Sequence, residues 1–181
     1  MNSTHHIKKA EIHIHLEATI SPELCRKFAN KNKVNLPSDI FGNKYAYEWT
    51  DFYDFIKKYD LVTSVIHTPE DYYELTYAYL KDCAANNVLY VEAMVSSTHA
   101  KLKGMTYDSF LEGVHLASKD AEKDFGIISR FIMNGIRHLG SDSVHMTAEE
   151  VLKNPHPSLV GFGLAGDELH FPPQLFSKTF D

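Results

Sequence analysis

The stretch "KAEIHIHLEATISPEL", residues 8–23, contains both a strand pattern and the start of a helix. Apolar residues alternate with other residues up to His15, and this period of two is typical of a β-strand. Ser21, Pro22 and Glu23 follow as an N-cap, a first-turn proline and a first-turn acid, a combination that predicts a helix. The stretch therefore predicts a strand followed by a helix, the first unit of an α/β fold.

Four short apolar runs predict strands. They are residues 10–15, 88–95, 126–136 and 159–166. Runs of this length and composition are typical of strands that are buried on both faces of a parallel sheet. The sheet is therefore expected to be parallel.

Helical patterns separate the predicted strands. One helix is expected to begin after Thr68 and another after Thr106, because each threonine can serve as an N-cap. Thr147 and Glu150 fit a capping box that would begin the helix before the last strand. The order β-α-β-α-β-α-β predicts a single α/β unit over residues 1–181.

The composition is that of a globular protein, with 44% hydrophobic and 23% charged residues. The formal net charge is −6 and no cluster of Lys and Arg is present, so no nucleic-acid partner is expected. No apolar run has the length of a membrane span, so no membrane partner is expected either. Cys25 and Cys83 lack C-x-x-C spacing, which favours reduced thiols and a cytoplasmic location. Residues 1–9 are expected to form a flexible tail.

Polar residues lie at the carboxyl end of each predicted strand. They are His13, His15 and Glu17 in the first unit, Glu92 and His99 in the second, Arg137 and His138 in the third, and Gly166, Asp167, Glu168 and His170 in the fourth. In a (β/α) barrel the site is built at this end of the strands and from the loops that follow them. The sequence therefore predicts one site to which all four units contribute.

His13 and His15 are the candidates for a metal site. Side chains at positions i and i+2 of a strand point to the same face, so both imidazoles can reach one ion. A catalytic zinc site needs at least a third protein ligand. The chain holds 11 histidines, so histidines that bind no metal are the alternative interpretation.

Two further segments each allow two interpretations. Phe52, Phe55 and Tyr59 recur at helical spacing, which predicts either core packing or an apolar wall against a flat ring. The glycines of "GFGLAGDE", residues 161–168, would let a backbone N–H approach a ligand closely. This segment is not a dinucleotide-binding fingerprint, because acidic residues and prolines follow it in place of a helix start.

The combination of segments resembles one family. "KAEIHIHLEATISPEL", "WTDFYDFIKKYDLV", "YVEAMVS", "IRH" and "GFGLAGDE" followed by "FPPQLF" occur in the order shown by the adenosine/adenine deaminases of the amidohydrolase superfamily. The resemblance extends over essentially the whole chain and implies a (β/α)8 barrel of the TIM type. Such a barrel takes roughly 250 residues, so four strands imply an incomplete barrel, about one half of it.

The resemblance also implies a reaction. One zinc ion would activate water for attack on C6 of a purine, with release of ammonia. By matching motifs, His13 and His15 would bind zinc, His15 and Glu17 would lie against the substrate, the backbone of Gly166 would hydrogen-bond the purine, and Phe52 and Phe55 would belong to an apolar lid.

Two departures from the family pattern leave alternatives open. The expected substrate is adenosine, which would give inosine and ammonia. The position of Glu17 is typically Asp in adenosine deaminases and often Glu in the adenine deaminase branch, so adenine, which would give hypoxanthine, is the alternative. The family's third zinc histidine, its proton-donating glutamate and its metal-binding aspartate have no match, so no catalytic residue is identified. A second polypeptide or self-association would then complete the barrel, or the chain would be an inactive split half that acts only in assembly. A metal-dependent phosphoesterase would need further His/Asp clusters and a basic group for phosphate near the site. It fits less well, because "GLAGDE" and the aromatic helix suit a neutral purine better.

Overall fold

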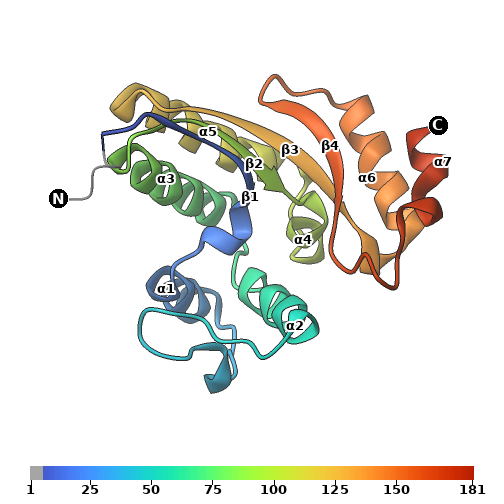
Figure 1. Cartoon of the computed structure of the whole chain (residues 1–181), viewed down its shortest axis with the longest axis horizontal. Coiled ribbons are helices and arrows are strands. Elements are labelled where there is room, and N and C mark those ends of the chain that lie inside the picture. The colour runs from blue at the N-terminus through green and yellow to red at the C-terminus, as the bar shows by residue number, and fades with distance from the viewer. Residues whose placement is uncertain (1–5) are drawn as a thin grey trace.

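The computed structural model describes residues 6–181, and its centre is a sheet of four parallel strands (Figure 1). The strands, in their spatial order, are β1 (Lys9–His15), β2 (Val88–Val95), β3 (Ile128–Ile136) and β4 (Leu159–Ala165). All four predicted strands are confirmed, and their ends agree to within about two residues. Parallel strands that lie in sequence order and are joined by helices form half of a (β/α)8 barrel, as expected.

Helices connect the strands and extend beyond them. They are α1 (Pro22–Asn32), α2 (Phe52–Thr63), α3 (Pro69–Ala85), α4 (Ser97–Leu102), α5 (Tyr107–Phe125), α6 (Ser141–Lys153) and α7 (Ser177–Phe180). Helices α3 and α5 lie side by side on one face of the sheet, whereas α1 and α2 lie beyond the carboxyl end of β1 (Figure 1). Within residues 6–181, no helix combines the length and the apolar character needed to cross a bilayer.

The expected helix starts are confirmed at three positions. Ser21 accepts a hydrogen bond from the Leu24 backbone N–H at the start of α1. Thr68 and Asp71 form a reciprocal capping box at α3, and Thr106 caps α5. Side chains that satisfy the free N–H groups of a first turn fix where a helix begins, which is why this local signal was sufficient.

The prediction for α6 was wrong at its start. The helix begins at Ser141, directly after Gly140, whose φ of +93° ends the preceding turn. Thr147 is therefore a buried residue in mid-helix, and its hydroxyl donates to the Ser143 carbonyl at 2.9 Å instead of capping a helix. The burial of Val144 and Thr147 on one face of α6 outweighs the capping pattern at Thr147.

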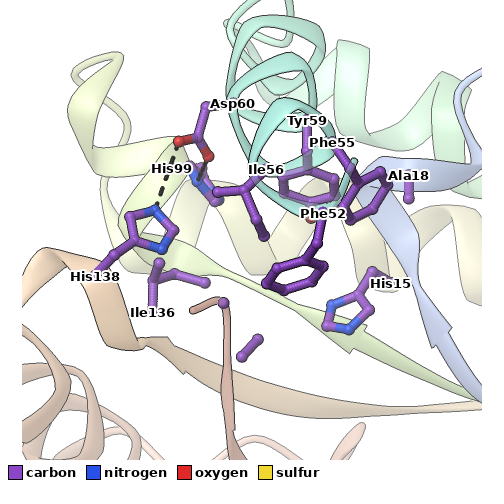
Figure 2. Close-up of a pocket in the computed structure, with 12 residues that line it drawn as sticks. His15, Ala18, Phe52, Phe55, Ile56, Tyr59, Asp60, His99, Ile136 and His138 are labelled. Carbon is purple, nitrogen blue, oxygen red and sulfur yellow. Dashed lines mark ion pairs between the residues drawn. The ribbon is translucent and has the colours of Figure 1, made fainter. Parts of the chain in front are cut away.

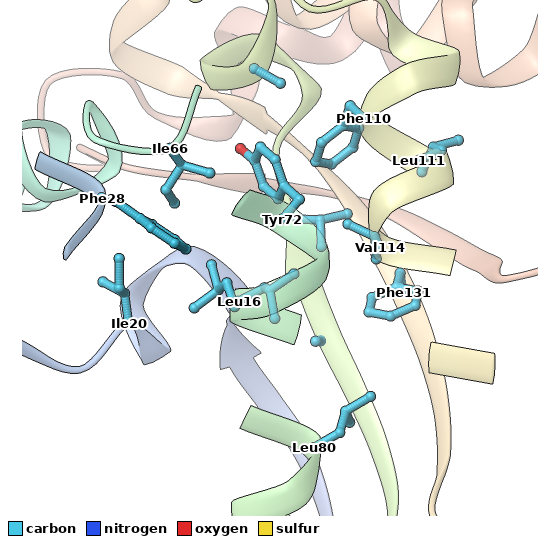
Figure 3. Packing of buried hydrophobic residues seen from close by; sticks show 14 of the residues in the cluster. Leu16, Ile20, Phe28, Ile66, Tyr72, Leu80, Phe110, Leu111, Val114 and Phe131 are labelled. Carbon is cyan, nitrogen blue, oxygen red and sulfur yellow. The ribbon is translucent and has the colours of Figure 1, made fainter. Parts of the chain in front are cut away.

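The core lies between the sheet and helices α3 and α5 and continues to Phe28 of α1 (Figure 3). Val91, Ala93 and Val95 alternate along β2 and are all buried on this side. Tyr72 of α3 and Phe110 of α5 meet edge to face, with ring centroids 4.7 Å apart. This packing leaves the carboxyl ends of the strands free to form a site.

The expected flexible tail, residues 1–9, overlaps the described part of the chain only at its end. Residues 1–5 lie outside the described part of the chain, so that part of the prediction is not addressed. Lys9 already belongs to β1, where its backbone N–H donates to the Asn87 carbonyl at 3.0 Å. Pairing with the segment before β2 therefore orders the end of the expected tail.

Candidate active site

A cavity of about 210 Å³ lies beyond the carboxyl ends of the strands (Figure 2). Its walls come from β1, β3, β4, α2 and α4 and from the turns that follow β1 and β3. Of the residues expected to contact substrate, His15, Phe52, Phe55 and Gly166 line the cavity. Ligands of parallel barrels bind at this end of the strands, so the cavity is the candidate active site.

His13 and His15 project from the same face of β1, as predicted. Their ring centroids are 6.3 Å apart, with an angle of 57° between the rings, and His15 reaches the cavity. Burial, together with the nearby His13, lowers the pKa of His15. A lowered pKa favours the neutral imidazole, which is the form that binds a metal ion.

The two histidines fit part of a zinc site. Their spacing and the neutral state of His15 suit a shared ion, and imidazole nitrogen is a preferred zinc ligand. Among residues 6–181, however, no three His, Cys, Asp or Glu side chains are placed to hold one ion together. The donor set within the described residues is therefore incomplete.

Glu17 lies behind the cavity wall. Its side chain is 1% exposed, and its Oε1 accepts a 3.0 Å hydrogen bond from the backbone N–H of Ser96. The Tyr59 hydroxyl lies 3.5 Å from the other carboxylate oxygen. Burial raises the pKa of Glu17. A contact between Glu17 and substrate stays a prediction, because the carboxylate does not line the cavity.

The aromatic side chains of α2 form one wall of the cavity. Phe52 and Phe55 are stacked, with centroids 6.4 Å apart, and Phe55 lies against Tyr59 at 6.1 Å. Phe52 is 51% exposed although it packs on its neighbour, which core packing does not explain. The geometry favours the interpretation as an apolar wall (Figure 2).

Gly166 directly follows β4 and lines the cavity. Its φ is +98°, a conformation that glycine adopts without strain. A Cβ at this position would lie 2.7 Å from Nδ1 of His138, so no larger residue fits without movement of that ring. The predicted glycine thus brings the backbone close to His138, at the edge of the cavity.

Asp60 is a site residue that was not predicted from the sequence. It bridges two histidines: Oδ1 lies 3.4 Å from Nε2 of His99, and Oδ2 lies 3.5 Å from Nε2 of His138 (Figure 2). Burial acts to raise the pKa of Asp60, but the two histidines hold it at about 2. One signal was available, because Asp60 is a charged residue eight positions after Phe52 on the cavity-facing stripe of α2.

Other polar residues at the strand ends have structural contacts. Arg137 is 7% exposed and donates to the Phe171 carbonyl at 2.9 Å, so it fixes the segment after β4. Glu92 accepts a hydrogen bond of 2.7 Å from the Tyr90 hydroxyl. Arg137 therefore has a structural role, whereas His138 next to it faces the cavity.

Parallel strands in sequence order, with histidines and an aromatic wall at their carboxyl ends, define about half of a (β/α)8 barrel with a cavity at the end of the strands where such barrels bind ligands. The sequence profile described as "Adenosine deaminase" matches residues 8–181, and the chain belongs to that family. An adenine deaminase of Sinorhizobium medicae is 40% identical over 178 residues, which are 98% of this chain and 54% of that protein. One from Pseudomonas putida is 34% identical over 176 residues, 97% of this chain and 56% of that protein. The chain thus spans about half the length of these curated relatives.

Solved structures show the same fold. The crystal structure of an adenine deaminase from Arthrobacter aurescens superposes with a TM-score of 0.82 at 28% identity, covering 94% of this chain and 52% of that one. An amidohydrolase from Burkholderia ambifaria, solved with bound Zn, gives a TM-score of 0.87 at 23% identity and covers 98% of this chain and 49% of that one. An Arabidopsis ADAL protein complexed with IMP gives 0.77 at 21% identity, covering 99% and 55%. The last two similarities concern the fold alone.

Proposed function

We propose that the complete protein removes the 6-amino group of adenine by hydrolysis, giving hypoxanthine and ammonia. The observation that carries this proposal is that one cavity is lined by His15, by the aromatic wall of α2 and by Gly166. Aromatic rings present the flat apolar surface that a purine needs. The adenine deaminases that share up to 40% identity with the chain, and Glu17 in place of Asp, support adenine over adenosine.

His13 and His15 would hold one zinc ion in the complete site. Zinc, when bound, acts as a Lewis acid and lowers the pKa of water. The chain's own contribution is to hold both imidazoles on one strand face and to keep His15 neutral by burial. Phe52 and Phe55 would exclude water from one side of the purine, and Gly166 would orient its edge through the backbone.

Polypeptide other than residues 1–181 would supply the remaining ligands and the proton donor. Two observations support this part of the proposal: residues 6–181 hold no three-ligand group, and β1 and β4 are the two edges of the sheet. An edge strand has unpaired backbone groups that another strand can satisfy. In the alternative, the chain is an inactive half that acts only in assembly. The edges of β1 and β4 would then also be covered by a partner.

The test is an assay of hydrolytic deamination, with adenine and with adenosine as separate substrates. The change in ultraviolet absorbance measures the reaction. The purified chain is assayed with zinc, alone and with a second polypeptide that carries the remaining family segments. Adenine turnover that a chelator abolishes and zinc restores is the expected result. Turnover by the chain alone would mean that a second copy completes the site. Absence of turnover with either substrate under both conditions would overturn the proposal and favour the inactive half.

A further inference from the structure

Helix α2 carries the aromatic wall of the cavity but lies apart from the sheet (Figure 1). Its main neighbour is the 3-10 helix η1 (Leu16–Thr19), which follows β1. Across the cavity, α2 must be held by other contacts if Phe52 and Phe55 are to keep a defined position. Asp60 is the charged residue on the stripe of α2 that faces the cavity.

Asp60 reaches two elements that belong to different βα units. Its two carboxylate oxygens lie 3.4 Å from Nε2 of His99 in α4 and 3.5 Å from Nε2 of His138 in the turn after β3. His99 is 9% exposed, and its Nδ1 has no hydrogen-bond partner in residues 6–181. A buried imidazole with few other partners depends on the carboxylate, so the three residues are coupled.

The same three residues form the partition between two cavities. The cavity of the candidate active site and a second one of about 150 Å³, lined also by Ser64 and Lys103, share Asp60, His99 and His138. Because cavities lie on both sides of these three residues, apolar packing contributes little to holding α2 in place there. The position of α2 over the site therefore depends here on the charge contact.

We propose that Asp60 is a positioning residue: its carboxylate, which bridges His99 and His138, docks helix α2 over the cavity and so sets the affinity of the site for a purine. The proposal rests on the proposed function for its ligand, but the docking of α2 is a property of the protein without ligand. Asp60 contacts neither His13 nor His15, yet under this proposal it is one of the residues that determine substrate binding.

The charged groups around His138 decide how docking responds to pH. Asp60 faces it from α2 and Asp167 from the turn after β4, while His99 lies on the other side of Asp60 and Lys103 lines the second cavity. The Asp60 carboxylate, 3.5 Å away, raises the pKa of His138, and burial opposes this effect. A raised histidine pKa means that the ion pair is complete at low pH and is lost as pH rises through that pKa.

The test compares Asp60→Asn with Asp54→Asn, an acid on the same helix that pairs within the helix with Lys58. Hydrogen exchange of the α2 amides is measured in the ligand-free protein, and KM and kcat for adenine are measured between about pH 5 and 8 in the complete enzyme. Asp60→Asn should speed exchange in α2 and raise KM about tenfold, because the charge contact of α2 with His99 and His138 is lost. The KM of the unaltered enzyme should rise with pH, and that of Asp60→Asn should not.

If Asp60 had a purely structural role, the KM of Asp60→Asn would still rise with pH, as in the unaltered enzyme. His99→Gln serves as a second variant, and combined with Asp60→Asn it should add little to either single change. Exchange in α2 that is the same for Asp60→Asn and Asp54→Asn would overturn the proposal. If the unaltered enzyme shows no purine turnover, the proposed function fails, and hydrogen exchange still decides whether Asp60 docks α2.

Discussion

Glu17 and Ser96 join the ends of two neighbouring strands: the Glu17 carboxylate accepts a 3.0 Å hydrogen bond from the Ser96 backbone N–H. Glu17 follows β1 and Ser96 follows β2, and both side chains are buried. A buried carboxylate must be hydrogen-bonded to be tolerated. The contact therefore holds the β1 end, with His15, in register with the β2 end beside the cavity.

Replacement of Glu17 should show the value of this contact. Glu17→Ala should lower the free energy of unfolding by about 2–3 kcal/mol, because it leaves the Ser96 N–H buried without a partner. Glu17→Gln keeps an acceptor at the same place and should cost less. Urea unfolding at pH 7 measures both, with Glu23→Ala on the exposed side of α1 as the control. Equal losses for the two Glu17 variants would contradict the hydrogen-bond account.

Asp71 should make stability depend on pH. It is fully buried, Lys31 lies 2.6 Å away, and the His67 backbone N–H donates to it at 2.9 Å. Burial acts to raise the pKa of Asp71, but these partners together lower it below the ordinary value. An acid whose folded pKa is lowered stabilises the protein above its unfolded pKa of about 3.9, and that stability is lost as pH falls further.

Asp71→Asn should therefore cost about 2 kcal/mol at pH 7 and much less near pH 3, because only the charged form gains from Lys31. Urea unfolding at both pH values measures the difference. Asp108→Asn, at an exposed position in α5, is the control and should change little at either pH. A loss for Asp71→Asn that is the same at pH 7 and pH 3 would refute the role of its charge.

The strands and most helix starts were predictable because their signals are local. Short apolar runs identify the parallel strands, although no residue of the edge strands β1 and β4 is fully buried. Ser21 or Thr68 caps a helix through atoms only a few residues away. The start of α6 was not predictable in this way. Gly140 begins the helix through its backbone conformation and no side chain caps it, so the pattern at Thr147 was misleading.

The site was predictable only in part, because side chains alternate between the two faces of the sheet only as far as the strand continues. His13 and His15 share a face as the strand period requires, but the chain enters a 3-10 helix at Leu16. Glu17 consequently points to Ser96 and not into the cavity. The Asp60 bridge joins residues that are distant in sequence, and no spacing rule connects them.

Gly113 marks a close approach of two helices that a side chain would disrupt. A Cβ at this position in α5 would lie 2.2 Å from the Pro69 carbonyl oxygen at the start of α3. Alanine is favoured over glycine in a helix by about 1 kcal/mol, but a backbone atom cannot move aside as a side chain can. Gly113→Ala should therefore destabilise the protein by about 2 kcal/mol.

Thermal unfolding measures this effect, and Leu116→Ala, at a residue on the same helix that is 49% exposed, is the control. The informative result for Gly113→Ala is whether the free energy of unfolding falls or rises. A stabilised protein would mean that helix propensity exceeds the clash and that α3 and α5 can separate without loss.

His13 and His15 should both be needed for zinc. Each replacement by alanine removes an imidazole from the shared strand face, and loss of a ligand should weaken zinc binding at least as much as loss of a supporting partner, roughly 10–100-fold. Calorimetric titration of zinc into the protein together with the segment that completes the site gives the affinities. His145→Ala, on α6 and paired with Glu149, is the control. Zinc affinity should also fall as pH is lowered, because protonated imidazoles cannot bind the ion. A zinc affinity that neither replacement changes would remove His13 and His15 from the metal site and, with them, the zinc-dependent part of the proposed reaction.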